Sequence, residues 1–98
     1  FSDDELAANL DARWDLCLWM EILAGVESPP AEQERRLSVQ VQRLANGLAM
    51  GGQLTPADQV RAIEAEWLAA GPMPPTEQAA ALAARFEAAH AAARERHF

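Results

Sequence analysis

Apolar residues recur at helical spacing along most of the chain, and this pattern predicts four helices. The strongest run is Trp14–Ala24 (WDLCLWMEILA), in which only Asp15 and Glu21 interrupt the apolar residues. No segment alternates apolar and polar residues over the length of a strand, so the pattern predicts an all-α fold. We expect one domain over residues 1–98, an up-and-down or partly open helical bundle. Its helices are expected at about 3–24, 29–49, 56–70 and 76–97.

Short capping signals set the expected helix ends. Ser and Thr side chains accept hydrogen bonds from the free backbone N–H groups at a helix start, and glycine is favoured just after a helix end. Ser2 and Glu5 form the pattern of a capping box, and Gly25 follows the first helix. In the second and third helices a proline follows the cap, where its missing N–H costs nothing. The expected N-caps are Ser2, Ser28, Thr55 and Thr76.

The first helix is apolar on all sides over Trp14–Ala24, which is typical of a helix enclosed by its own domain or by a partner. A membrane span needs about 20 apolar residues, roughly twice this run. We therefore expect a central core helix with Trp14 as a structural anchor. The face with Leu16, Trp19 and Leu23 has no obvious cover and is our candidate interface. It would meet a preceding repeat or, in a homodimer, a second copy; alternatively, the core closes around the helix.

The second helix carries an apolar seam of about two heptads, which is too short to predict a free-standing coiled coil. We expect this seam to pack on the first helix. Three arginines of the second helix, Arg35, Arg36 and Arg43, are expected to neutralise carboxylates of that helix. The seam consists of Leu37, Val41, Leu44 and Leu48, and it is flanked by Arg36, Gln40 and Arg43.

The third and fourth helices each offer one narrow apolar face, and a rigid corner joins them. Trp67 stands just before the Gly71–Pro75 corner, and Phe86 is one of the few large residues of the alanine-rich fourth helix. We expect Trp67 and Phe86 to be structural anchors of the packing. The alternative is a ligand groove lined by these two rings.

Composition narrows the possible partners. The formal net charge is −7, and all eight basic residues are arginine. An acidic surface repels phosphate backbones, so we expect no nucleic-acid binding by these residues. We find no signal peptide and no membrane span, which favours a cytoplasmic protein with no membrane association. Because the chain starts at Phe1 rather than Met, we interpret it as a piece of a longer protein.

The residue types that carry chemistry do not form a recognisable site. Cys17 lies within an apolar run, which indicates a buried structural thiol rather than a nucleophile. Three carboxylates on one side of the first helix could bind a metal or act as acids and bases, but they are more typical of a solvated face. These are Asp4, Asp11 and Asp15.

Glu87 and His90 have the Glu-x-x-His spacing of carboxylate-bridged metal sites in helix bundles. Such a site needs a second copy of the pattern, and Arg94 stands three residues before His97 where a Glu would be required. We therefore expect surface histidines and no metal or cofactor. No catalytic motif is present, and we do not expect an enzyme.

One stretch resembles a known family. Glu64–Pro74 (EAEWLAAGPMP) is followed by Leu82 and Arg85–Phe86. This pattern resembles the repeat of a bacterial family known as domain of unknown function 349. Its repeats pair a short helix ending in Glu-Trp-x-x-x-Gly-Pro-x-Pro with a long helix that carries Leu-Trp-x-Arg-Phe and a later aromatic pair. The resemblance covers about residues 56–96.

The departures from this family suggest a degenerate, terminal repeat. Ala83 stands at the family's Trp position, and Ala92–Ala93 stand where its aromatic pair would lie. End units of stacked arrays are usually atypical. The resemblance implies a helical-repeat architecture and a bacterial origin, but no activity.

Together these observations favour a non-catalytic helical scaffold or protein–protein interaction module. The alternative is a part of a nucleic-acid-associated protein whose basic contacts lie outside these residues.

Overall fold

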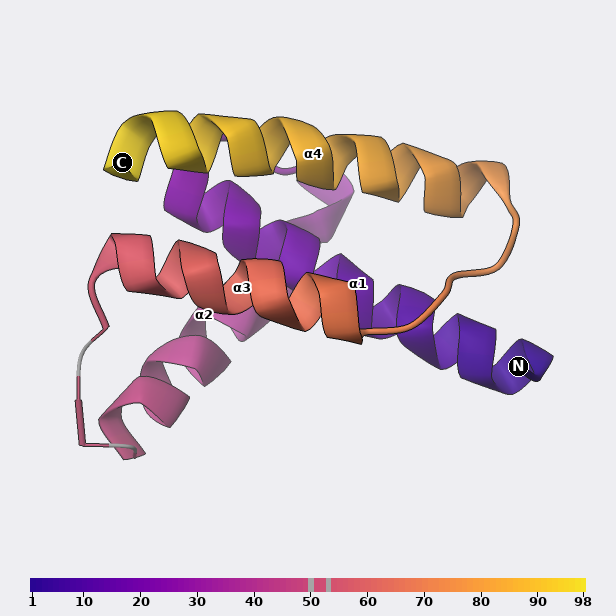
Figure 1. The fold of residues 1–98 in the computed structure, drawn as a ribbon, viewed down its shortest axis with the longest axis horizontal. Helices are drawn as coiled ribbons and strands as arrows, with labels where there is room; N and C mark the ends of the chain where they lie inside the picture. Colours follow the sequence, from indigo (N-terminus) through magenta and orange to yellow (C-terminus); the bar gives the residue numbers. More distant parts are fainter. Residues whose placement is uncertain (50, 53) are drawn as a thin grey trace.

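The computed structural model describes residues 1–49, 51–52 and 54–98, and in this part the chain is helical without a β-strand. The predicted all-α fold is confirmed. The described residues form four α-helices, arranged as in Figure 1, and a short 3₁₀ helix before the second of them. The elements are α1 (Asp3–Ala24), η1 (Pro30–Glu32), α2 (Gln33–Ala49), α3 (Pro56–Ala69) and α4 (Glu77–His97).

Three of the four predicted N-caps are confirmed. Ser2 and Glu5 form both hydrogen bonds of the capping box that starts α1. Thr55 and Thr76 accept hydrogen bonds from the backbones of the helices they precede. Gly25 ends α1 in the left-handed conformation, with φ of 70°, which glycine adopts without steric cost.

The predicted start of the second helix is wrong. Ser28 caps no helix; its hydroxyl donates to the carboxylate of Glu21 at 2.7 Å. The chain instead forms the 3₁₀ turn η1 before α2 begins at Gln33. The buried Glu21 carboxylate requires a hydrogen-bond donor, and this requirement outweighs the local capping preference of Ser28.

α1 is the central helix of the bundle, as predicted, and it packs against α2, α3 and α4 (Figure 1). α3 and α4 also contact each other, whereas α2 packs on α1 alone among the α-helices. The small side chains of α4 allow its backbone to approach α1 closely. The buried apolar core consists of Leu16, Cys17, Leu18, Trp19, Met20, Leu23, Ala24, Val39, Val60, Ile63, Leu82, Phe86, Ala89 and Ala93.

The candidate interface on the first helix is buried, so its assignment as an exposed face is wrong. Leu16, Trp19 and Leu23 are only 5, 7 and 8 % exposed. The prediction held that the other helices could not cover this face. In the structure Leu16 lines the same space as Val39 of α2 and Ala69 of α3, so the core closes around α1 within this chain.

None of the described helices combines the length and the apolar character that a membrane span requires.

Candidate functional site

α2 turns its polar face toward the rest of the bundle. Arg35 pairs with Asp15 of α1 at 2.8 Å and with Asp11 at 3.1 Å. Val39 is the one buried residue of this helix. The inward side of α2 is therefore held by charge pairs and a single valine. Two of the three predicted α1 carboxylates thus bind an arginine.

The other two arginines of α2 also face the bundle, although not the carboxylates predicted for them. Arg36 donates to the backbone carbonyl of Val26 at 2.7 Å. Arg43 forms a bidentate pair with Glu66 of α3, at 3.0 and 3.1 Å. The prediction that the arginines neutralise carboxylates of the first helix is thus confirmed for Arg35 and wrong for Arg36 and Arg43.

The apolar seam of α2 faces outward, so the prediction that it packs on the first helix is wrong. Four large aliphatic side chains on one face of a two-heptad helix are more than half exposed. We call this face the α2 seam. Its members are Leu37 (60 % exposed), Val41 (58 %), Leu44 (59 %) and Leu48 (73 %).

Charge pairs and the burial of α1 both accompany this rotation of α2. Asp11 and Asp15 stand on the side of α1 that meets α2, and Arg35 lies opposite the seam at 100° per residue. Both carboxylates are exposed, Asp11 at 78 % and Asp15 at 48 %, so each pair contributes at most about 1 kcal/mol. The apolar residues of α1 from Leu16 to Met20 are each less than a tenth exposed, so little apolar surface of α1 remains for the seam to join.

The flanks of the α2 seam are neutral and mostly small. Between Leu37 and Leu48 the residues beside the seam are exposed or half-buried and carry no charge, whereas the exposed Glu34 continues the line of the seam one turn before Leu37. Of the four charged residues in α2, the three arginines face the bundle, and only Glu34 shares the outward half. An acidic molecule thus presents one charge-poor apolar stripe. The flanking residues are Ser38, Gln40, Ala45 and Gly47.

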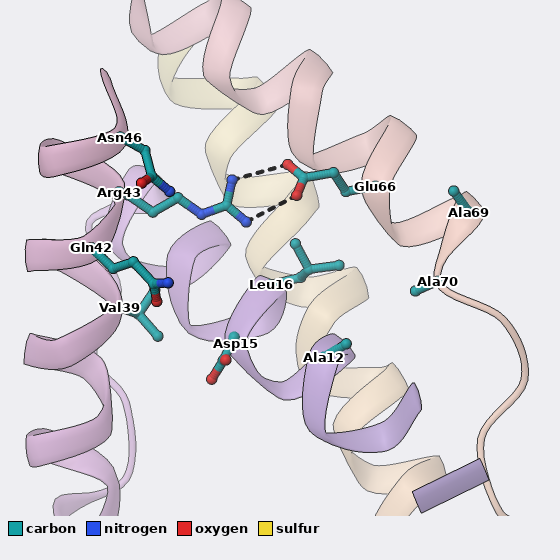
Figure 2. Close-up of a pocket in the computed structure, with 10 residues that line it drawn as sticks. All are labelled: Ala12, Asp15, Leu16, Val39, Gln42, Arg43, Asn46, Glu66, Ala69 and Ala70. Atoms are coloured by element: carbon teal, nitrogen blue, oxygen red, sulfur yellow. Dashed lines mark hydrogen bonds and ion pairs between the residues drawn. The ribbon is translucent and has the colours of Figure 1, made fainter. Parts of the chain in front are cut away.

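A cleft of about 460 Å³ lies behind α2, between it, α1 and α3 (Figure 2). The Arg43–Glu66 pair spans this cleft. Asp15, at the α1 side of the cleft, is paired with Arg35. The charged groups of the cleft therefore neutralise one another, and its lining contains no nucleophile. The lining residues are Ala12, Asp15, Leu16, Val39, Gln42, Arg43, Asn46, Glu66, Ala69 and Ala70.

A buried ionic network fastens α4 to α1 and to η1. Arg85 of α4 donates to Glu21 at 2.8 and 3.2 Å and to Glu32 of η1 at 2.9 Å. Trp14 donates its indole N–H to Glu32 at 2.5 Å, which accounts for its role as an anchor. Burial alone would lower the pKa of Arg85, but its hydrogen bonds to Glu21 and Glu32 outweigh this effect and raise the pKa. The guanidinium is permanently charged, so the network neutralises two carboxylates rather than exchanging protons.

Cys17 is fully buried in the core, as predicted. Burial, with the nearby Glu21 charge, raises the pKa of its thiol to about 12. At neutral pH the thiol is protonated and has no access to solvent, so it lacks the properties of a nucleophile.

The histidines are engaged separately. His90 is hydrogen-bonded to Glu64 of α3, while Glu87 is exposed, so the Glu-x-x-His pair does not converge. His97 lies 2.6 Å from the backbone carbonyl of Leu23. Hydrogen bonds from Arg94, together with one to His90, lower the pKa of Glu64 to about 2 against the effect of burial. Among the residues that the structure describes, no group of three His, Cys, Asp or Glu side chains could hold a metal ion.

Trp67 and Phe86 contact each other. Their rings stack at 3.8 Å with an interplanar angle of 5°, and Phe86 is buried. The guanidinium of Arg13 lies over the Trp67 ring at 4.5 Å and donates to the carbonyl of Gly71 in the corner. The stack and the Arg13 contact support the role of both rings as packing anchors.

Sequence reasoning missed both the outward seam and the Glu21–Arg85 pair. The pair joins residues 64 positions apart, so no local spacing predicts it. The available signal was Glu21 itself, since a carboxylate inside an apolar helix requires a buried partner. For the seam, no local signal distinguishes an outward face from an inward one.

Comparison of the chain with protein-family models, with curated proteins and with solved structures finds no match.

Proposed function

We propose that this chain is a non-catalytic protein–protein interaction module and that the α2 seam is its contact surface. One observation carries the proposal: α2 turns its polar face inward and leaves Leu37, Val41, Leu44 and Leu48 more than half exposed. Contiguous apolar patches on small acidic domains usually mark protein interfaces. A helical stripe at 4-3-4 spacing is suited to a second helix.

The other features of the structure give little support to a catalytic function. The cleft behind α2 contains paired charges, Cys17 is buried and protonated, and Glu87 and His90 point to different surroundings. This supports a binding role over a catalytic one.

The nucleic-acid alternative gains no support from the described residues. Their arginines largely donate to oxygen atoms of this chain, which leaves few of them for phosphates. Those with such hydrogen bonds are Arg13, Arg35, Arg36, Arg43, Arg61, Arg85 and Arg94.

We further propose that residues 56–96 are a terminal repeat of a longer bacterial, cytoplasmic protein. The support is the Glu-Trp-x-x-x-Gly-Pro-x-Pro pattern, in which Trp67 stacks on Phe86 and Gly71 takes a φ of 81°. A rigid corner and a ring stack would fix the angle between the two helices of such a repeat.

Site-specific photo-crosslinking in cells tests the interaction function. A photoreactive amino acid replaces Gln40 beside the seam or, as a matched control, Leu68, which is 83 % exposed on α3. We expect protein adducts, including possible adducts with a second copy, from position 40. They should disappear when Leu44→Asp is added. Equal adducts from positions 40 and 68, or adducts unaffected by Leu44→Asp, would contradict the proposal.

A further inference from the structure

The α2 seam is self-complementary because its spacing is symmetric. The steps from Leu37 to Val41, Leu44 and Leu48 are four, three and four residues, so the pattern is the same in both directions. An antiparallel alignment with a second α2 therefore places Leu37 opposite Leu48 and Val41 opposite Leu44. Each seam residue then meets one apolar partner, as an interface with two-fold symmetry requires.

The flanks favour a second copy over a partner chosen by charge. In the same alignment the residues that flank the seam also meet. Ser38 meets Ala45 of the second copy along one side of the seam, and Gln40 meets Gly47 along the other side. No like charges oppose each other, although the chain as a whole carries a formal charge of −7. Each flanking pair contains a small residue, which allows the helix axes to approach closely. A charged helical partner is normally selected by ion pairs at these positions, and here none is available.

The position of α2 leaves room for this pairing. α2 packs on α1, and the seam lies on the face of α2 opposite Arg35, which binds Asp15 of α1. An antiparallel arrangement also places the positive end of one helix dipole beside the negative end of the other. Only four large side chains per copy would be covered, so the interface belongs to the small, weak class.

We propose that the α2 seam binds the same seam of a second copy of this chain, antiparallel, about a two-fold axis between Val41 and Leu44. This inference rests on the proposed function and names the partner of that surface.

Sedimentation of the whole 98-residue chain tests the association. We expect a monomer–dimer equilibrium between about 1 µM and 1 mM, the range of weak interfaces. Leu44→Asp should weaken it at least about tenfold, as expected when a charge is buried without a partner. Leu68→Asp, on an exposed apolar residue of α3, should leave it unchanged. Circular dichroism should show equal helix content in all three proteins.

Disulfide trapping tests the orientation. In the antiparallel dimer Leu37→Cys meets Leu48→Cys of the second copy, whereas two Leu37→Cys side chains are 11 residues apart along the axis, or about 16 Å. A disulfide needs Cα atoms within about 7 Å. We expect an equal mixture of the two variants to form the mixed disulfide and each variant alone to form little. Wild type, with only the buried Cys17, is the background control.

Three results would overturn the inference. These are a wild-type chain that stays monomeric over the whole range, a dimer that Leu44→Asp does not weaken, and disulfides formed by each single variant alone, which indicate parallel pairing. Failure here is separable from failure of the proposed function. A monomeric chain that still gives seam-dependent adducts to other proteins from position 40 retains the interaction role with a different partner.

Discussion

Removing Arg85 should destabilise the fold more than removing any exposed arginine, because it strands two carboxylates. Glu21 has a side chain only 6 % exposed, and Glu32 is 17 % exposed. In Arg85→Met the aliphatic volume is largely kept, but both charges lose their cation. Breaking a buried ion pair by removing one partner costs about 3–5 kcal/mol. We expect about 3 kcal/mol, the lower end, because the Arg85 side chain itself is 25 % exposed.

The size of this effect should come from the stranded carboxylates, and a second substitution separates that cause from lost packing. Adding Glu21→Gln to Arg85→Met removes the more buried charge and leaves an amide that can still accept the Ser28 hydroxyl. The double variant should therefore regain about 1–2 kcal/mol relative to Arg85→Met. Arg85→Lys should be intermediate, since an ammonium group cannot match the planar fork that serves Glu21 and Glu32 together.

Urea unfolding followed by circular dichroism measures these differences. A chain of this size has a stability of about 5–15 kcal/mol, so a loss of about 3 is measurable while the protein still folds. The matched control is Arg61→Met, whose partner Asp58 lies at 3.4 Å and whose side chain is 59 % exposed. It should change stability by less than about 0.5 kcal/mol. If Arg85→Met is as mild as this control, or if Glu21→Gln worsens it further, the network does not fasten α4 as argued.

Three further predictions follow from the other contacts. Trp67→Ala should cost about 3 kcal/mol in thermal unfolding because it removes the stack on Phe86, while Leu68→Ala, at the neighbouring exposed position, should cost less than about 0.5. Glu64, with its pKa lowered from 4.5 to about 2, stabilises the fold above pH 4.5 and loses this effect as the pH falls toward 2. The melting temperature should accordingly fall less steeply over that range in Glu64→Gln, whereas exposed Glu87→Gln should follow wild type. The chain should not shift the mobility of RNA or DNA at near-physiological salt; micromolar, salt-sensitive binding would contradict the argument from net charge.

The boundaries of three helices could be predicted because their signals are local. The Ser2–Glu5 capping box and Gly25 act within one turn of the helix ends, and the structure places α1 at 3–24 as expected. The Thr-Pro start of α3 and the Thr-Glu start of α4 are equally local. The predicted start of α2 was wrong because the Ser28 hydroxyl donates to Glu21, and capping rules do not take this distant partner into account.

The rotation of helices about their axes could not be predicted from periodicity alone. Periodicity identifies the apolar face of α2 but not the surface it meets, which depends on how much of α1 is already covered. The burial of Trp19 shows the same limit, because a count of the large side chains on the other helices predicted that its face would be left uncovered. Long-range pairs such as Arg35–Asp15 join residues that no local pattern relates, so periodicity does not predict them either.

Burial of the exposed seam by a partner would release free energy that folding of this chain alone does not gain. Fully burying a large aliphatic side chain contributes about 1.5–3 kcal/mol. The four seam residues are about 60 % exposed, so their remaining burial amounts to about 4–7 kcal/mol per copy. Association costs about 4–15 kcal/mol in lost freedom of motion. The burial of two seams, about 8–14 kcal/mol, lies within the same range. If two copies pair through the seam as proposed, we therefore expect a reversible, concentration-dependent dimer rather than a permanent one.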